Sequence, residues 1–365
     1  MKRLEESMKR SWFPLVTLLL FSGALIGCGL FQPSPEDTGA GRIGYVGGGS
    51  VGDGHGVILK TEDAGLTWTR VGSSELPDVD LYQVRAIDKS IALAAGMPSG
   101  GYGLILRTTD GGATWQRLGT SAAIPNVEMS GIAAVNSRIF WVVGASGVIL
   151  KTTDGGATWA TQEAAGITAD LGAVSVVDEN NAWIIGGPQD GYSVILHTAD
   201  GGATWTRQGT SETVPRGGLI DVSAYNADTC WACGTEGSII RTVNGGTTWA
   251  STESMHSIIH YNGIIALGRD TAWSAVDDDL MVFTEDGGQS YDMIKIPTTE
   301  GLGYALLTVA ATDADHVWTA GIWFNSPQTQ VGTILRSTDR GATWHRAATP
   351  VNTTFRRISF VGSRQ

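Results

Sequence analysis

Short aliphatic runs, each followed by a fixed set of polar and glycine residues, recur along the whole chain. Such a run, for example residues 104–106, ends in a basic or polar residue and precedes the pattern Ser/Thr-x-Asp-x-Gly-x-x-Trp. Aliphatic runs bounded by turn residues predict strands, and the Asp-x-Gly segment predicts the turn between two of them. Each copy is therefore predicted to be a β-hairpin.

The pattern returns at intervals of about 46 residues, a length typical of a four-stranded propeller blade. The Asp carboxylate can accept turn N–H groups, the glycines supply positive φ, and the Trp packs at the sheet interface. A feature repeated in every blade is a structural device rather than a unique reaction centre. Its seven Asp or Asn positions are Asp63, Asp110, Asp154, Asp200, Asn244, Asp286 and Asp339.

Two further columns of strands appear when the copies are aligned. One reads aromatic-x-x-Gly, as at residues 141–144, and the other is an apolar strand ending in Asp, Asn or Gly, as at residues 174–178. The first unit lacks a preceding apolar strand and the chain ends in an unpaired one at residues 355–362. We predict an all-β fold, a seven-bladed β-propeller of four-stranded blades over residues 42–365, with the C-terminal strand completing the first blade.

The N-terminus has a different composition. Basic residues precede an apolar run at residues 12–26, which is too short for a comfortable transmembrane span and leads into Gly27 and Cys28. This resembles a bacterial lipoprotein signal, which implies removal of residues 1–27, acylation of Cys28 and a tether at residues 28–41; an ordinary secretory signal or an uncleaved anchor is the alternative. The acyl chains would hold the protein in the cell envelope, on the periplasmic side of an outer membrane or at the cell surface.

Composition narrows the possible partners. The formal net charge of −12 argues against nucleic acid, and against adhesion of the ring itself to an anionic membrane. Cys230 and Cys233 are too far apart on one strand for a disulfide and are predicted to be buried packing residues. No cofactor or metal is predicted, because the run Asp277–Asp279, which could hold Ca²⁺, is more typical of a solvated turn.

The irregular connections are predicted to lie on the face opposite the Asp boxes, since the strands of a blade alternate in direction. The longest insertion, residues 322–330, contains Trp323 and Phe324. Aromatic side chains exposed on a loop mark contact sites, so these two are candidates for binding a partner. The alternative is that they fold back over the rim of the neighbouring blade.

The innermost strand of each unit has mostly small residues on one face, and Arg85 is the exception. Two residues earlier on that face lie polar or charged groups, namely Gln83, Asp221, Thr308 and Arg357. Together with Arg216 on a variable loop, the charged residues are candidates for partner binding, and several of these polar and charged groups are predicted to ring one mouth of the central channel. The alternative is internal ion pairing of Arg85 or Arg357 with a carboxylate.

The boxes at residues 108–115 and 152–159 both read Thr-Thr-Asp-Gly-Gly-Ala-Thr-Trp. With such boxes over essentially all of residues 42–365, the chain resembles the Asp-box (BNR) repeat propellers, and among them the photosystem II stability/assembly factor-like group. This resemblance implies a non-catalytic binding scaffold outside the cytoplasm. The expected partner is a membrane or envelope protein, held by the irregular face.

Sialidases are similar in carrying Asp boxes on a propeller, so a glycoside hydrolase or a glycan-binding propeller is the alternative. Their chemistry needs an arginine triad, a Tyr activated by a Glu, and an Asp acid/base. Arg85, Arg216 and Arg357 are candidate arginines, but no Tyr/Glu pair can be assigned to them, and the first unit reads Gly-Arg-Ile-Gly where that family has Arg-Ile-Pro. We therefore predict that the protein is not an enzyme.

Overall fold

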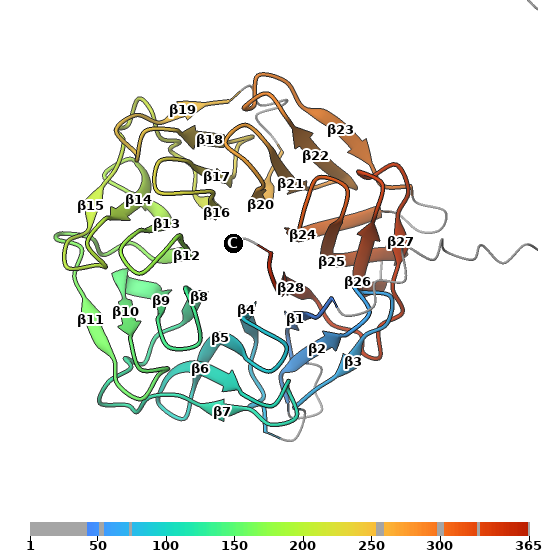
Figure 1. The fold of residues 1–365 in the computed structure, drawn as a ribbon, viewed down its shortest axis with the longest axis horizontal. Helices are drawn as coiled ribbons and strands as arrows, with labels where there is room; N and C mark the ends of the chain where they lie inside the picture. The colour runs from blue at the N-terminus through green and yellow to red at the C-terminus, as the bar shows by residue number, and fades with distance from the viewer. Residues whose placement is uncertain are drawn as a thin grey trace, which may run out of the picture. The chain divides into compact units, whose positions relative to one another are not determined.

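Seven four-stranded antiparallel sheets form a ring in the computed structural model of the protein (Figure 1). The structure describes residues 42–50, 55–72, 75–252, 259–297, 303–326 and 329–363. Cys28, with the predicted signal and tether, lies outside these residues. Within the described ranges the single helical element is the 3-10 turn η2 (Ala145–Gly147), and no helix is long and apolar enough to cross a membrane. The predicted seven-bladed, all-β propeller is confirmed.

Each blade runs from an inner strand beside the central channel to a short outer strand. The inner strands of blades 1 to 7 are β28 (Phe355–Phe360), β4 (Leu81–Ala86), β8 (Met129–Ala134), β12 (Leu171–Val176), β16 (Leu219–Ala224), β20 (Tyr261–Ala266) and β24 (Gly303–Ala311). The second strands are β1 (Gly44–Gly48), β5 (Ala92–Ser99), β9 (Phe140–Gly144), β13 (Ala182–Gln189), β17 (Cys230–Gly234), β21 (Ala272–Val276) and β25 (Val317–Ser326).

The two remaining strands of each blade flank an Asp box. The third strands are β2 (Val57–Thr61), β6 (Tyr102–Thr108), β10 (Ile149–Thr152), β14 (Tyr192–Thr198), β18 (Ile239–Thr242), β22 (Leu280–Thr284) and β26 (Thr329–Ser337). The outer strands are β3 (Thr69–Arg70), β7 (Gln116–Arg117), β11 (Ala160–Gln162), β15 (Thr206–Arg207), β19 (Ala250–Ser251), β23 (Asp292–Lys295) and β27 (His345–Arg346).

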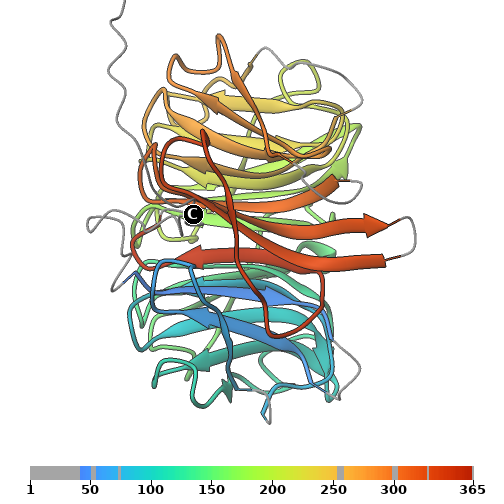
Figure 2. The ribbon, with the colours of Figure 1, turned by 90° about the vertical axis from the view of Figure 1, so that its right-hand side faces the viewer.

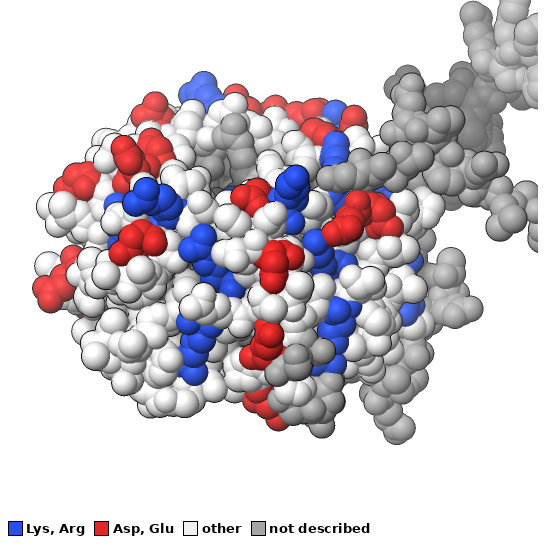
Figure 3. Space-filling view, turned by 60° about the horizontal axis from the view of Figure 1, so that its bottom comes forward, with Lys and Arg blue, Asp and Glu red and all other residues white. Residues whose placement is uncertain are grey.

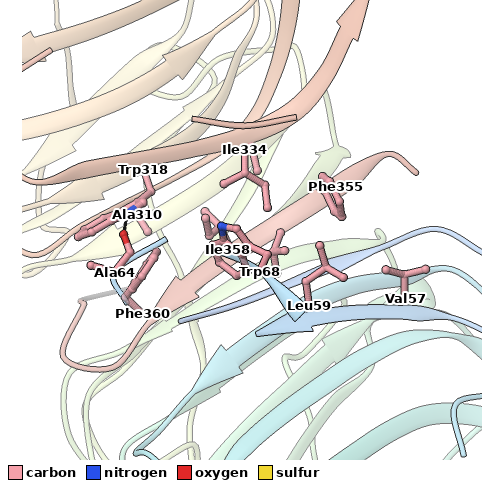
Figure 4. Packing of buried hydrophobic residues seen from close by; sticks show 12 residues of the cluster. Val57, Leu59, Ala64, Trp68, Ala310, Trp318, Ile334, Phe355, Ile358 and Phe360 are labelled. Atoms are coloured by element: carbon pink, nitrogen blue, oxygen red, sulfur yellow. Dashed lines mark hydrogen bonds between the residues drawn. The ribbon is translucent and has the colours of Figure 1, made fainter. Parts of the chain in front are cut away.

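The C-terminal strand closes the ring, as the sequence predicts. β28 pairs antiparallel with β1, so the first blade has the order β28-β1-β2-β3. Between blades 7 and 1, Trp318 stacks on Phe360 at 4.0 Å and its Nε1 donates to the Ala64 carbonyl at 2.7 Å (Figure 4). Closure therefore rests on a buried apolar cluster together with a directed hydrogen bond.

The aromatic-x-x-Gly column supplies the packing between blades. Its large rings are fully buried, and each contributes roughly 4–6 kcal/mol of apolar burial before entropy is subtracted. In blade 2 the smaller Leu93 takes this place and is also fully buried. The buried aromatic residues are Tyr45, Trp141, Trp183, Trp231, Trp273 and Trp318.

The Asp boxes are tight hydrogen-bonded turns, as predicted. Asp110 accepts the Thr114 N–H at 2.9 Å and the Thr114 hydroxyl at 2.6 Å, while Thr108 Oγ1 accepts the Gly112 N–H at 2.8 Å. Gly111 and Gly112 have φ of 75° and 94°, which a residue with a Cβ rarely adopts. The Thr114 hydroxyl, followed by its N–H, lowers the pKa of Asp110 to about 2. The repeated carboxylates are thus occupied within their own turns.

Candidate binding site at the mouth of the central channel

The two faces of the ring differ in what they carry. Because the strands alternate in direction, the second-to-third strand connections and the links to the next inner strand share one face, here called the loop face. The Asp boxes lie on the other, the box face. The β25–β26 hairpin projects beyond the other blades on the loop face (Figure 2).

Every inner strand has a β-bulge at the same place, near its start on the loop face. In blade 2, for example, the register shifts between Leu81 and Gln83, so Tyr82 is the extra residue. A bulge re-aims the extra side chain relative to the strand's alternation. The bulged residues are Arg356, Tyr82, Ser130, Gly172, Ile220, Asn262 and Leu307, in the order of blades 1 to 7.

These seven residues converge on one hollow at the channel mouth. A cavity of about 240 Å³ is lined by all of them together with Glu128 and Arg357. Tyr82, Ile220 and Leu307 are half-buried there, so apolar surface remains available in a hollow otherwise bordered by polar and charged groups. An apolar centre with a polar rim is the usual anatomy of a protein interface. The sequence analysis predicted Arg357 at the mouth but missed the seven bulged residues.

A tyrosine and a glutamate meet in this cavity, although the sequence analysis could not pair them. Burial, and next the Glu128 carboxylate, which hydrogen-bonds the phenol, raise the pKa of Tyr82. The Tyr82 hydroxyl also lies 3.1 Å from Met97 Sδ, and Ser130 donates to Glu128 Oε1 at 2.9 Å. Tyr82 is therefore protonated at neutral pH and oriented by two neighbours.

Arg356 joins the mouth to a second hollow on the loop face. Its Nη2 donates to Asp80 Oδ2 at 2.9 Å, and its guanidinium lies 5.2 Å from the centre of the Tyr82 ring. The same arginine lines an adjoining hollow of about 300 Å³, between blades 7 and 1, with Asn352 and Thr353 among its neighbours. The two hollows therefore share a wall whose charge is already paired.

The predicted alternative of internal ion pairing is confirmed for Arg357. Its Nη1 lies 2.9 Å from Asp221 Oδ2, and the two side chains are 13% and 14% exposed. Arg357 is on β28 of blade 1 and Asp221 on β16 of blade 5, so the pair spans the channel as a cross-brace. Burial raises the pKa of Asp221, and the Arg357 charge opposes that shift.

Most other polar groups predicted to ring the mouth have a structural role instead. Gln83, Thr308 and Asp221 each accept an N–H from the inner strand of the following blade, at 3.4, 3.4 and 2.9 Å. Ser175, Ser223 and Ser359 do the same at 3.0, 3.0 and 3.1 Å. They are polar because they satisfy backbone donors on the next inner strand.

Arg85 differs from the rest of its column. Its Nη1 is shielded from solvent, and the residue forms no hydrogen bond or ion pair with any residue that the structure describes. The ion pair considered for Arg85 is therefore absent from the described part of the chain. Burial lowers the pKa of Arg85 to about 10, which leaves the guanidinium charged at neutral pH.

The expectation that Trp323 and Phe324 stand on an uncovered loop is wrong. Both lie in β25, because that hairpin continues as paired strands beyond the ring. Trp323 packs on the core cluster of blades 6 and 7, and the Arg346 guanidinium covers it at 3.8 Å from the ring centre. Phe324 is half-buried and lines a separate cavity of about 390 Å³. Whether either contacts a partner stays a prediction.

The remaining candidates are dispersed. Arg216 is exposed on the connection between β15 and β16 and is not among the residues that line the mouth. Asp277 and Asp279 accept hydrogen bonds from Asn262 Nδ2 and the Tyr304 N–H, so only Asp278 of that run is exposed. Within the described ranges no group of three acidic, His or Cys side chains could hold a metal. Cys230 and Cys233 are buried free thiols, as predicted.

Acidic and basic side chains are interspersed on the side of the ring shown in Figure 3.

Residues 126–218 match the family model of photosynthesis system II assembly factor YCF48, and no curated protein matches the chain. Two solved YCF48 structures share the fold. The chain resembles the YCF48 propellers. YCF48 from Cyanidioschyzon merolae is 23% identical, with TM-score 0.57, over 75% of this chain and 86% of that one.

A structure of YCF48 bound to a D1 peptide is 17% identical, with TM-score 0.55, over 73% of this chain and 80% of that one. A GH74 xyloglucanase from Xanthomonas campestris is 12% identical, with TM-score 0.58, over 87% of this chain. The present chain spans about half of that enzyme, 55%. These likenesses show the propeller fold, which hosts many functions.

Proposed function

We propose that the protein is a non-catalytic scaffold that binds a segment of another protein over the channel mouth on the loop face. The observation that carries this is the convergence of seven bulged residues, one from each blade, on one cavity with half-buried Tyr82, Ile220 and Leu307. The partial match to the YCF48 family, one of whose members has been solved with a bound D1 peptide, supports the same class of function.

The charges at the mouth favour an apolar anchor rather than an acidic one. Arg356 is paired with Asp80, and Arg357 with Asp221, so both guanidinium groups are compensated before a partner arrives. An apolar side chain that enters between Tyr82, Ile220 and Leu307 would bury surface without breaking either pair.

The second part of the proposal is location. A lipid on Cys28 would hold the ring outside the cytoplasm, on the periplasmic side of an outer membrane or at the cell surface, where the partner would be a membrane or envelope protein. Cys28→Ser tests the anchor, because it should move the protein from the membrane fraction to the soluble fraction and abolish labelling by a fatty-acid analogue. Retention of label in Cys28→Ser would exclude acylation at this residue.

Binding is tested by crosslinked pull-down with Leu307→Glu, which places a charge in the apolar part of the mouth. Leu66→Glu is the matched control, since Leu66 is 41% exposed in the Asp box of blade 1, on the opposite face. We expect a defined partner with wild type and with Leu66→Glu, and at least ten-fold less with Leu307→Glu. Equal recovery with all three proteins would show that the mouth is not the binding surface.

One observation favours a second candidate, recognition or hydrolysis of a carboxylated sugar. The Tyr82–Glu128 pair shares its cavity with two arginines, and a sialidase-like site combines a Tyr and a Glu with three. A screen of fluorogenic glycosides with wild type and Tyr82→Phe tests it. Turnover that Tyr82→Phe loses would support this candidate, and no turnover by wild type would remove hydrolysis.

A further inference from the structure

The inner strands carry an uneven set of charges. All seven strands together contain three arginines, Arg85, Arg356 and Arg357, and one acidic residue, Asp221. Asp80 pairs with Arg356 and Asp221 pairs with Arg357. Arg85 is the arginine of this set that has no counter-charge among the described residues.

Arg85 lies on β4, one of the inner strands beside the central channel. The equivalent positions of the other six inner strands are buried between blades, whereas Arg85 keeps partial exposure. Those six residues are Ala133, Ser175, Ser223, Ile265, Ala310 and Ser359. Five of them are Ala or Ser, and a guanidinium needs more room than these side chains, which favours a position of its partially exposed end toward the channel.

A partly buried guanidinium without a counter-charge is energetically costly. Nη1 of Arg85 is both shielded from solvent and without a hydrogen-bond acceptor among the residues described. Protein charges in such positions are paired or are solvated by an ordered ion or water. The unmet donors of Arg85 therefore point to a ligand that brings negative charge.

We propose that the central channel binds a small oxyanion, of the carboxylate or phosphate class, beside Arg85. The planar guanidinium favours oxygen acceptors of this geometry. The Arg357–Asp221 cross-brace lies about two residues, or roughly 7 Å, nearer the mouth along the inner strands. A polypeptide that enters from the mouth meets this brace first, so the ligand is small and free. This site is independent of the binding function proposed above.

The test compares thermal unfolding of the purified protein in sodium formate, in inorganic phosphate, and in the sodium salt of a bulky sulfonate buffer at equal ionic strength. Arg85→Gln removes the charge, and Arg138→Gln is the matched control because Arg138 is exposed between β8 and β9. Calorimetric titration of formate and phosphate measures binding directly, which keeps the test decisive if Arg85→Gln folds poorly.

We expect the Tm of wild type and of Arg138→Gln to rise saturably, by about 5 °C at a hundred-fold excess of anion over its Kd. Arg85→Gln should show no such rise and should lose the calorimetric signal. An equal rise in Arg85→Gln would place the anion elsewhere, and the absence of saturable binding to wild type would overturn the proposal.

Discussion

Removing the acid of the cross-brace should be among the most damaging single changes in the ring. In Asp221→Ala, the Arg357 guanidinium would stay in the channel without its partner at 2.9 Å, and the Ile264 N–H would lose its acceptor. Breaking a buried pair on one side costs about 3–5 kcal/mol, because the remaining charge is uncompensated. For a protein of this size the Tm should fall by on the order of 10 °C.

The assay is urea unfolding followed by tryptophan fluorescence, with two companions. Replacing both partners by leucine should recover most of the loss, since no uncompensated charge remains. Glu285→Ala breaks the exposed Arg340–Glu285 pair at 3.1 Å, where the side chains are 43% and 55% exposed, and should cost less than about 1 kcal/mol. If Asp221→Ala costs no more than Glu285→Ala, the brace is not a structural element and the reasoning fails.

Three other predictions follow from individual hydrogen bonds. Ser223→Ala leaves the buried Ala266 N–H without an acceptor and should lower the free energy of unfolding, measured in urea, by about 1–3 kcal/mol. Ser130→Ala at the mouth should lower it by less than about 0.5 kcal/mol. Equal losses in the two variants would refute the inter-blade role of Ser223. Trp318→Phe removes the donor to the Ala64 carbonyl and should lower the unfolding free energy by about 1–3 kcal/mol, and an unchanged value would show that ring closure does not depend on this bond. The Thr158 hydroxyl, followed by its N–H, lowers the pKa of Asp154 from 3.8 to about 2, so its stabilisation is present above about pH 4 and is lost as the pH falls toward about 2. Asp154→Asn, which copies the box at Asn244, should flatten the acid limb of the stability-pH curve, and an unchanged limb would show that this box carboxylate does not contribute.

The fold was predictable because its signals are local and repeated. Each box joins a turn that needs Asp and glycine to a Trp that packs between sheets, and the seven copies support one another. Ring closure could also be derived, since an inner-type strand at residues 355–362 has no other blade to complete. Each box is held by hydrogen bonds within eight residues, so its turn could be predicted without knowledge of contacts to other blades.

The channel mouth could not be derived in the same way. Period-two alternation assigns side chains to the two faces of a strand, but the bulge in each inner strand breaks that alternation at one residue. The sequence analysis therefore selected Gln83, Asp221 and Thr308, which bond to the next blade, and passed over Tyr82 and Leu307, which line the cavity. A polar residue in an otherwise apolar column can accept a hydrogen bond from a neighbouring backbone as well as bind a ligand.

Trp323 shows the opposite difficulty. Its insertion looks like a loop because it follows a glycine and contains a proline, yet residues 322–324 pair with β24 on one side and β26 on the other. Arg346, from the outer strand of the same blade, covers the ring at 3.8 Å, just as Arg117 covers Tyr102 at 3.6 Å in blade 2. The repetition of this contact in two blades identifies it as a way to hold the strands at the loop face together.

The charged residues that stand out in the aligned inner strands can be explained only by contacts with other parts of the ring. Asp221 and Arg357 are each anomalous in their own blade, and the closed ring makes them partners because blades 1 and 5 face one another over the channel. Asp80, from the connection before β4, compensates Arg356 in a similar way. Arg85 has no such partner among the described residues, although the chain as a whole is acidic, with a net charge of −12. The channel therefore keeps an unpaired positive charge in an acidic protein, and a diffusible anion is the simplest way to satisfy it.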